Sequence, residues 1–159
     1  MILSFAWTTP AVVLGKKDTT RRDWSPKTIA MARKIMAQGG TFDAWDKSPR
    51  FGGKPIGTVR ILELIENEDS KMLAESEWER EGFHVLQALN ARIGKRGAIE
   101  VWQFWKHDNE TPQTALRFEV VSLNEHGNDL AWKCHDELEK VGGPIALQTA
   151  LNAWSGVAS

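Results

Sequence analysis

The clearest strand signal in this chain is Ile56-Gly57-Thr58-Val59-Arg60-Ile61-Leu62-Glu63-Leu64-Ile65. Its apolar residues alternate around Val59 and Ile61, which is the period of a strand with one buried face. The preceding residues 48–55 contain two glycines and two prolines and predict a loop. Before that loop, residues 42–46 give a second, shorter strand signal, so we expect two strands joined by an irregular connection.

A strand and two helices are predicted toward the N-terminus. Residues 1–5 are a short apolar run that is typical of a strand. A threonine-proline start signal and a later glycine bound a short helix within residues 8–15. A serine-proline start and two glycines bound a longer helix within residues 25–40, which is expected to flank the sheet.

An acidic helix is predicted over residues 68–81. Met72, Leu73 and Trp78 are expected to point inward from it, with the acidic side chains on the solvated face. Gly82 is expected to end or kink this element.

Further helices and one more strand are predicted in the second half of the chain. Residues 83–93 are expected to form a helix. The signals in residues 98–105 conflict, and two tryptophans spaced three apart favour a helix over a strand. Residues 115–123 predict a strand, and about thirty mainly helical residues follow Asn124, with a break at residues 142–144.

Several short strands separated by helices, without regular strand-helix-strand alternation, predict an α+β domain. We expect a small mixed β-barrel flanked by helices, with extra C-terminal helices packed on the same domain. The sequence has no glycine-rich phosphate loop of the nucleotide-triphosphatase or Rossmann kind, which excludes kinase-like and dehydrogenase-like functions.

The composition fits one soluble domain. The 159 residues are 42% hydrophobic, which is enough for a core. No stretch approaches the roughly 20 apolar residues of a membrane helix, and the first residues lack a signal-peptide pattern, so a cytoplasmic protein without a membrane partner is expected. The single cysteine, Cys134, cannot form an internal disulfide, and the four histidines lack metal-site spacing. We expect neither a metal nor a cofactor.

The charges are unevenly placed although the net charge is only −1. Residues 1–60 contain eleven Lys or Arg and four Asp or Glu, whereas residues 61–81 contain two basic and eight acidic side chains. A protein that coats a long phosphate backbone is usually basic throughout, so this pattern favours capture of one or a few nucleotides. The alternative is a soluble domain with ordinary charge blocks.

The densest functional signal is Gly15-Lys16-Lys17-Asp18-Thr19-Thr20-Arg21-Arg22-Asp23. Four cations and two hydroxyls follow a predicted helix end and form a loop suited to an anion. In an extended segment Thr20 and Arg22 share one face, and a bend at Asp18 lets Lys17 and Thr20 converge on one ligand. The alternative is a solvated edge strand whose charges prevent aggregation.

A second candidate surface spans residues 44–54. Here Trp45 is a candidate to stack on a flipped base and Asp46 to read its edge. The remaining candidate ligand-binding residues of this loop are Ser48, Arg50 and Lys54. In the alternative interpretation Trp45 fills the barrel and the cations are solvated. A smaller basic turn at residues 92–96 is suited to backbone contact, although such turns are commonly solvated.

Four segments occur in the order seen in ASCH domains: Ile2–Phe5, Gly15–Arg22, Gly57–Ile61 and Glu81–Phe83. The chain therefore resembles the ASCH branch of the PUA-like superfamily over residues 1–124. Residues 125–159 are a C-terminal helical extension that the resemblance does not cover. The resemblance implies a barrel with a cleft at its mouth, of the kind that binds RNA or modified bases in PUA, YTH and EVE modules.

The same resemblance implies specific site residues. Some small ASCH proteins are amidohydrolases that remove the acyl group from N4-acetylcytidine, and residue matching places their lysine, threonine and glutamate at Lys17, Thr20 and Glu81. In that role a desolvated lysine activates the threonine hydroxyl, and the glutamate orients the pair or moves a proton.

This chain departs from the catalytic type in ways that favour a polynucleotide over a free nucleoside. It is longer, carries a tryptophan-rich loop and has Arg21 where the catalytic type is usually apolar. Lys16, Arg21 and Arg22 are accordingly assigned to ligand binding together with Lys17 and Thr20.

Three functions follow from the sequence. The first is a binding module for RNA, single-stranded nucleic acid or a modified nucleoside, which uses the barrel cleft. The second is a small hydrolase in the same cleft, either an amidohydrolase or a metal-independent ribonuclease. The third is a protein-interaction domain, and it allows a homodimer in which Trp132 and Trp154 form the contact surface.

Overall fold

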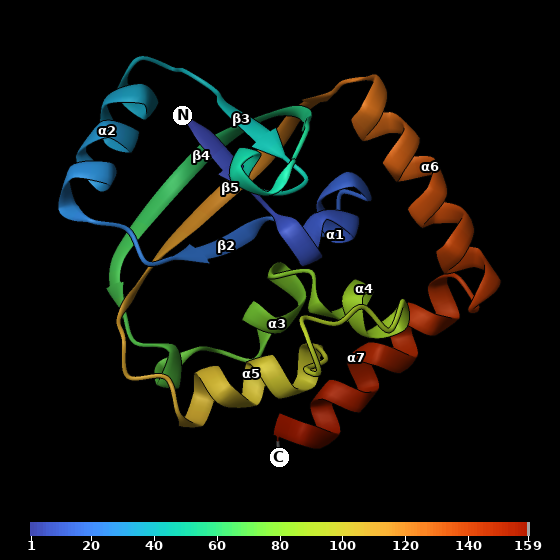
Figure 1. Cartoon of the computed structure of the whole chain (residues 1–159). Helices are drawn as coiled ribbons and strands as arrows, with labels where there is room; N and C mark the ends of the chain where they lie inside the picture. The colour runs from blue at the N-terminus through green and yellow to red at the C-terminus, as the bar shows by residue number, and fades with distance from the viewer. Residues whose placement is uncertain (159) are drawn as a thin grey trace.

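Five strands form one curled, half-barrel sheet in the computed structural model, with helices around it (Figure 1). The structure describes the backbone of residues 1–158 and the side chains of residues 1–154. The strand order is β1-β3-β4-β5-β2. The strands are β1 (Ile2–Ser4), β2 (Thr19–Arg22), β3 (Phe42–Trp45), β4 (Pro55–Glu68) and β5 (Gln113–Leu123).

The sheet is mixed and strongly bent. β1 runs parallel to β3, and the other neighbouring strands are antiparallel. The long β4–β5 pair has three register shifts, which increase the local twist and curl the sheet. The two edge strands, β1 and β2, are brought together by Arg22, whose Nη2 donates to the Ser4 carbonyl oxygen at 2.5 Å.

The helices form two groups around this sheet. In Figure 1, α2 and α6 lie on opposite sides of the sheet, whereas α3, α4, α5 and α7 gather in a separate layer beside β2. The helices are α1 (Thr9–Val13), α2 (Pro26–Ala37), α3 (Ser76–Arg80), α4 (Phe83–Ala88), α5 (Ala98–His107), α6 (Glu125–Lys140) and α7 (Pro144–Ala158). Three short 3-10 turns are η1 (Ala6–Thr8), η2 (Pro49–Phe51) and η3 (Ser70–Met72).

Each layer has its own hydrophobic core. The sheet core combines apolar residues of all strands except β2 with residues of α1, α2 and α6. The helical core is mostly aromatic, and its main rings are Trp78, Phe83, Trp102 and Trp154. Trp154 of α7 stacks on Trp78 with ring centroids 4.6 Å apart, so the C-terminal helix completes the helical core.

Several expectations from local sequence are confirmed. Residues 56–65 lie within β4, and residues 98–105 are helical within α5. The predicted serine-proline start is present in α2, where the Ser25 hydroxyl accepts a hydrogen bond from the Thr28 backbone N–H at 3.2 Å. The predicted helices after Asn124 are α6 and α7, and they are separated at residues 141–143.

The predicted acidic helix over residues 68–81 is wrong in extent. The chain forms η3, becomes extended at Leu73 and begins α3 only at Ser76. Met72, expected to point inward, is 81% exposed, while Leu73 and Trp78 are buried as expected. A local and a long-range hydrogen bond account for this difference. The Asp69 side chain accepts from the Lys71 backbone N–H, and the Ser70 hydroxyl donates to the Trp105 carbonyl oxygen at 2.7 Å.

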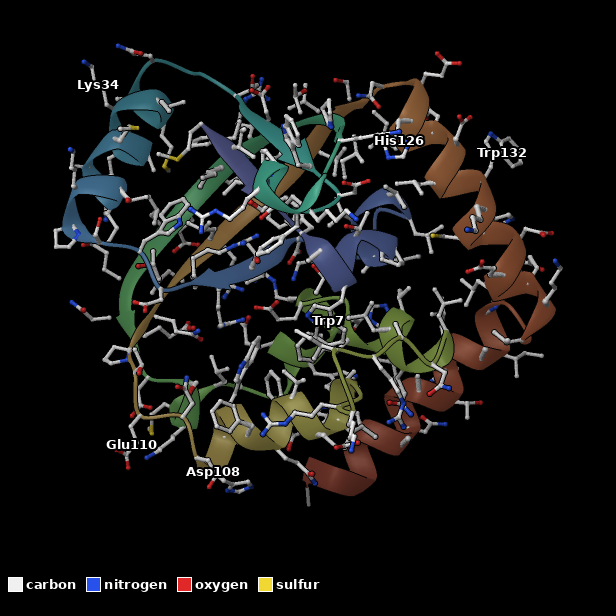
Figure 2. The ribbon with its side chains drawn as sticks, viewed as in Figure 1. Trp7, Lys34, Asp108, Glu110, His126 and Trp132 are labelled. Carbon is white, nitrogen blue, oxygen red and sulfur yellow. The ribbon has the colours of Figure 1, made fainter. Side chains whose placement is uncertain are left out.

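Two further expectations need correction. The helix predicted over residues 83–93 ends at Ala88, because Asn90 adopts a left-handed conformation that turns the chain. Trp154 does not share a contact surface with Trp132, since Trp154 is buried in the helical core. Trp132 is 75% exposed on α6 and points away from the body of the protein (Figure 2).

Candidate functional site

A cavity of about 400 Å³ lies where β1 and β2 face the helical layer. Its floor is polar, with Lys17, Thr20, Arg21, Arg22 and Glu81, and its other walls are largely aromatic. The aromatic and apolar lining residues are Phe5, Trp7, Phe83, Ile93, Val101, Phe104 and Trp105. Figure 2 shows Trp7 between the sheet and the helical layer. Such a combination of apolar walls and a few convergent polar groups is typical of ligand sites.

Lys17 and Glu81 form a buried ion pair on the cavity floor. The Lys17 Nζ donates to Glu81 Oε2 at 2.6 Å and to the Glu81 carbonyl oxygen at 3.0 Å. The two side chains are only 1% and 2% exposed. Burial lowers the pKa of Lys17, and the adjacent Glu81 carboxylate opposes this shift only in part. The resulting amine is easier to deprotonate than an exposed lysine.

Arg21 lines the same cavity and donates to the Glu81 carboxylate. Its Nη1 donates to Glu81 Oε1 at 2.6 Å, its Nη2 to Glu77 at 2.8 Å and its Nε to Glu68 at 2.5 Å. Arg117 completes the cluster with two hydrogen bonds to Glu77. The sequence assigns Arg21 to ligand binding, and Arg21 lines the cavity, but each of its three guanidinium nitrogens already donates to a carboxylate.

The network also perturbs Glu77. Partial burial works to raise the pKa of Glu77, but hydrogen bonds from Arg117 and Arg21 outweigh it and lower the pKa to about 2. Glu77 therefore stays ionised across the ordinary pH range. The three carboxylates of the cluster are matched by the charges of Arg21, Arg117 and Lys17.

Thr20 and Arg22 are two polar floor residues with hydrogen-bonding groups that no described residue uses. No residue in the described part of the chain hydrogen-bonds to the Thr20 hydroxyl. The Arg22 Nε is buried without a partner among the described residues, and its guanidinium lies 5.6 Å from the centroid of the Phe5 ring. Because β2 begins at Thr19, both side chains share one strand face, as predicted for an extended segment.

Each residue of the segment Glu81-Gly82-Phe83 contributes to the cavity or its support. Glu81 forms an ion pair with Lys17, and the Phe83 ring centroid lies 5.6 Å from the Trp7 ring centroid in the cavity wall. Gly82 has φ of +78°, and a Cβ there would lie 2.4 Å from the Ala11 Cβ and 3.0 Å from the Lys17 Cβ. The close approach of this segment to Lys17 therefore requires glycine.

We expect Gly82→Ala to destabilise the protein by about 2–4 kcal/mol, because it adds a steric clash to an unfavourable left-handed conformation. Urea unfolding monitored by tryptophan fluorescence measures the change. Gly39→Ala is the matched control, since Gly39 has a similar φ of +66° but a Cβ added there would meet nothing within 4 Å. Equal losses in the two variants would show that conformation alone, and not the contact with Lys17, requires Gly82.

The second candidate surface lies outside the cavity. Asp46 is held by the Lys54 backbone N–H at 2.8 Å and by His126 Nε2 at 2.9 Å (Figure 2 shows His126 on α6). Burial works to raise the pKa of Asp46, but these hydrogen bonds lower it overall. Trp45 is half-buried, and Arg50 and Lys54 are exposed. Ser48 is half-buried in the same loop, and no residue of this surface lines the cavity in the described structure.

Lys16 also lies away from the main cavity. It is exposed and lines a smaller hollow of about 230 Å³ with Arg80 and His84. Arg80 is paired there with Asp18 at 2.9 Å. Lys17 lines both depressions, whereas Lys16 lines only the smaller one.

Several important residues were not identified from sequence. Trp7, Phe104 and Trp105 line the cavity, and Glu77 and Arg117 support its floor. The number of tryptophans signalled that some would be available for stacking, but no local pattern distinguished Trp7 and Trp105 from the buried indoles.

Chemically, the site offers an aromatic slot, a buried lysine-glutamate pair, a free hydroxyl and a guanidinium with an unused donor. Among the described residues, no group of three or more His, Cys, Asp or Glu side chains could hold a metal ion, and no helix is long and apolar enough to cross a membrane.

A scan against models of protein families, a search of curated proteins and a search of solved structures found no match to this chain.

Proposed function

We propose that this protein binds a single nucleobase in the cavity between the sheet and the helical layer, either within single-stranded RNA or as a modified nucleoside. The observation that carries the proposal is the cavity itself, whose volume of about 400 Å³ and aromatic walls suit one nucleoside. Trp7 and Trp105 supply surfaces for base stacking, which is worth about 1–3 kcal/mol for each base.

The polar floor supports recognition of the edge of a base. The Arg22 guanidinium lines the cavity and carries N–H donors for a base carbonyl or ring nitrogen, and the Thr20 hydroxyl can both donate and accept. Glu81 Oε1 and Oε2 each accept one hydrogen bond from the protein, so each retains a lone pair for an exocyclic amine. A base brings both donors and acceptors and thereby satisfies this mixed floor.

Titration of the protein with nucleosides tests this proposal. The panel contains N4-acetylcytidine and the four ordinary ribonucleosides, and binding is followed by quenching of tryptophan fluorescence. We expect saturable quenching by at least one nucleoside and about tenfold weaker binding in Arg22→Met, which removes a charged donor. Arg33→Met is the control, because Arg33 is an exposed α2 residue paired with Glu66. A panel without any saturable quenching would contradict the proposal.

A second function, hydrolysis of an N-acyl group from the bound base, is favoured by one specific observation. The free Thr20 hydroxyl and the buried Lys17, whose pKa is lowered by burial, line the same cavity. Neutral Lys17 would accept the Thr20 proton while the threonine oxygen bonds to the acyl carbon. The proton then passes to the leaving amine as the C–N bond breaks. Water hydrolyses the Thr20 ester, which releases the carboxylic acid and restores the hydroxyl.

A further inference from the structure

A tight basic turn stands at the rim of the cavity between α4 and α5. The backbones of Ile93 and Arg96 exchange two hydrogen bonds, at 2.9 and 3.0 Å, around Gly94, which has φ of +60°. The Arg92 Nη1 donates to the Lys95 carbonyl at 2.8 Å and closes the turn further. The turn is therefore internally bonded, and its shape does not depend on a ligand.

The three cations of this turn have no acidic partner. Arg92, Lys95 and Arg96 are exposed, and none of them forms an ion pair in the described part of the chain. Most other arginines of the protein differ in this respect, since Arg21, Arg33, Arg60, Arg80 and Arg117 each pair with a carboxylate. The turn thus presents a local excess of positive charge.

The turn is also connected to the cavity. Ile93 and Arg96 belong to its lining, and the Arg96 guanidinium lies 5.3 Å from the centroid of the Phe104 ring, another lining residue. This cation–π contact holds the guanidinium beside the aromatic wall. A ligand whose flat, apolar part lies between the aromatic walls of the cavity therefore places the polar group attached to that part near this turn.

We propose that the turn of Arg92, Lys95 and Arg96 binds the phosphate of a nucleotide whose base occupies the cavity. This inference rests on the proposed function and specifies its ligand as a phosphorylated nucleoside. A phosphate is costly to bury in an aromatic cavity, whereas at the rim it stays partly hydrated and meets three unpaired cations. The phosphate comes either from a free nucleotide or from an RNA strand.

Binding measurements on matched ligands test the inference. Each of the five nucleosides is compared with its 5′-monophosphate and with an RNA pentamer that carries the same base at its centre. We expect the phosphorylated forms to bind at least about tenfold more tightly than the nucleoside. The variant Arg92→Gln/Lys95→Gln, which leaves the cavity-lining Arg96 in place, should lose most of this gain but keep its affinity for the nucleoside.

The control variant is Lys34→Gln/Lys133→Gln, which changes the net charge equally at exposed sites on α2 and α6 (Lys34 is labelled in Figure 2). It should retain the preference for phosphate. If the monophosphate binds more tightly than the pentamer, the phosphate belongs to a free nucleotide. If the pentamer binds more tightly, it belongs to an RNA strand. Nucleoside binding without any gain from phosphate would overturn this inference and leave the proposed function intact, whereas no binding of any ligand would overturn both.

Discussion

Replacement of Arg21 by methionine should destabilise the folded protein by about 3–5 kcal/mol, because it leaves buried carboxylates without their shared partner. The Arg21 side chain is completely buried and contacts Glu68, Glu77 and Glu81. Methionine fills much of the same volume, so the expected loss is mainly electrostatic. Chemical unfolding at neutral pH measures it.

The pH dependence separates this cause from a simple packing defect. In the wild type, Glu77 has a folded pKa of about 2, below its ordinary value of 4.5. Its stabilising contribution is therefore present above about pH 4.5 and is lost as the pH falls toward 2. The destabilisation by Arg21→Met should shrink over the same window, since protonated carboxylates need no cation. A pH-independent loss would indicate packing instead.

Arg33→Met is the matched control for this experiment. The Arg33–Glu66 pair joins two exposed side chains, which are 50% and 43% accessible to solvent. Exposed pairs of this kind contribute about 0–1 kcal/mol. A comparable destabilisation in both variants would contradict the structural importance assigned to the buried cluster.

Thr20→Val should abolish deacylation of N4-acetylcytidine, with a rate loss of at least about a hundredfold, if the second proposed function is correct. Valine has nearly the shape of threonine but lacks the hydroxyl that attacks the acyl carbon. Because that hydroxyl makes no hydrogen bond in the described structure, the substitution should leave the unfolding midpoint nearly unchanged. Release of acetate, followed by mass spectrometry or NMR, measures the rate.

Thr19→Val provides the comparison within the same strand. The Thr19 hydroxyl accepts a hydrogen bond from Arg117 at 2.7 Å and does not line the cavity. This variant should keep its deacylation rate while losing a little stability. Unchanged activity in Thr20→Val would exclude the threonine as the nucleophile. Wild-type protein that binds the nucleoside without releasing acetate would restrict the protein to binding.

Local sequence signals were sufficient for most elements of the fold. The alternation around Val59 and the serine-proline start at Ser25 depend on neighbouring residues, so their structural outcome could be predicted. Met72 shows the limit of this approach. Its helical spacing suggested burial, but the hydrogen bond from Ser70 to Trp105 joins residues 35 positions apart and redirects the chain.

The candidate site could be predicted only in part, because it too depends on contacts between residues that are far apart in the sequence. Lys17 and Thr20 were placed together by an assumed bend, and Glu81 came from the resemblance to ASCH domains. The structure brings all three to one cavity. The position of Arg21 depends on three partners between 47 and 60 residues away, and no pattern within residues 15–23 could distinguish a guanidinium that binds carboxylates from one that faces a ligand.

The stacking of Trp154 on Trp78 has a consequence for biosynthesis. The aromatic rings contributed by α3, α4 and α5 leave the ribosome well before α7, yet they lack their last partner until α7 is made. During that interval Trp78 and Trp102 present apolar surface to water or to chaperones. The nascent chain can form its strands early, but it can complete its helical layer only after Trp154 has left the ribosome.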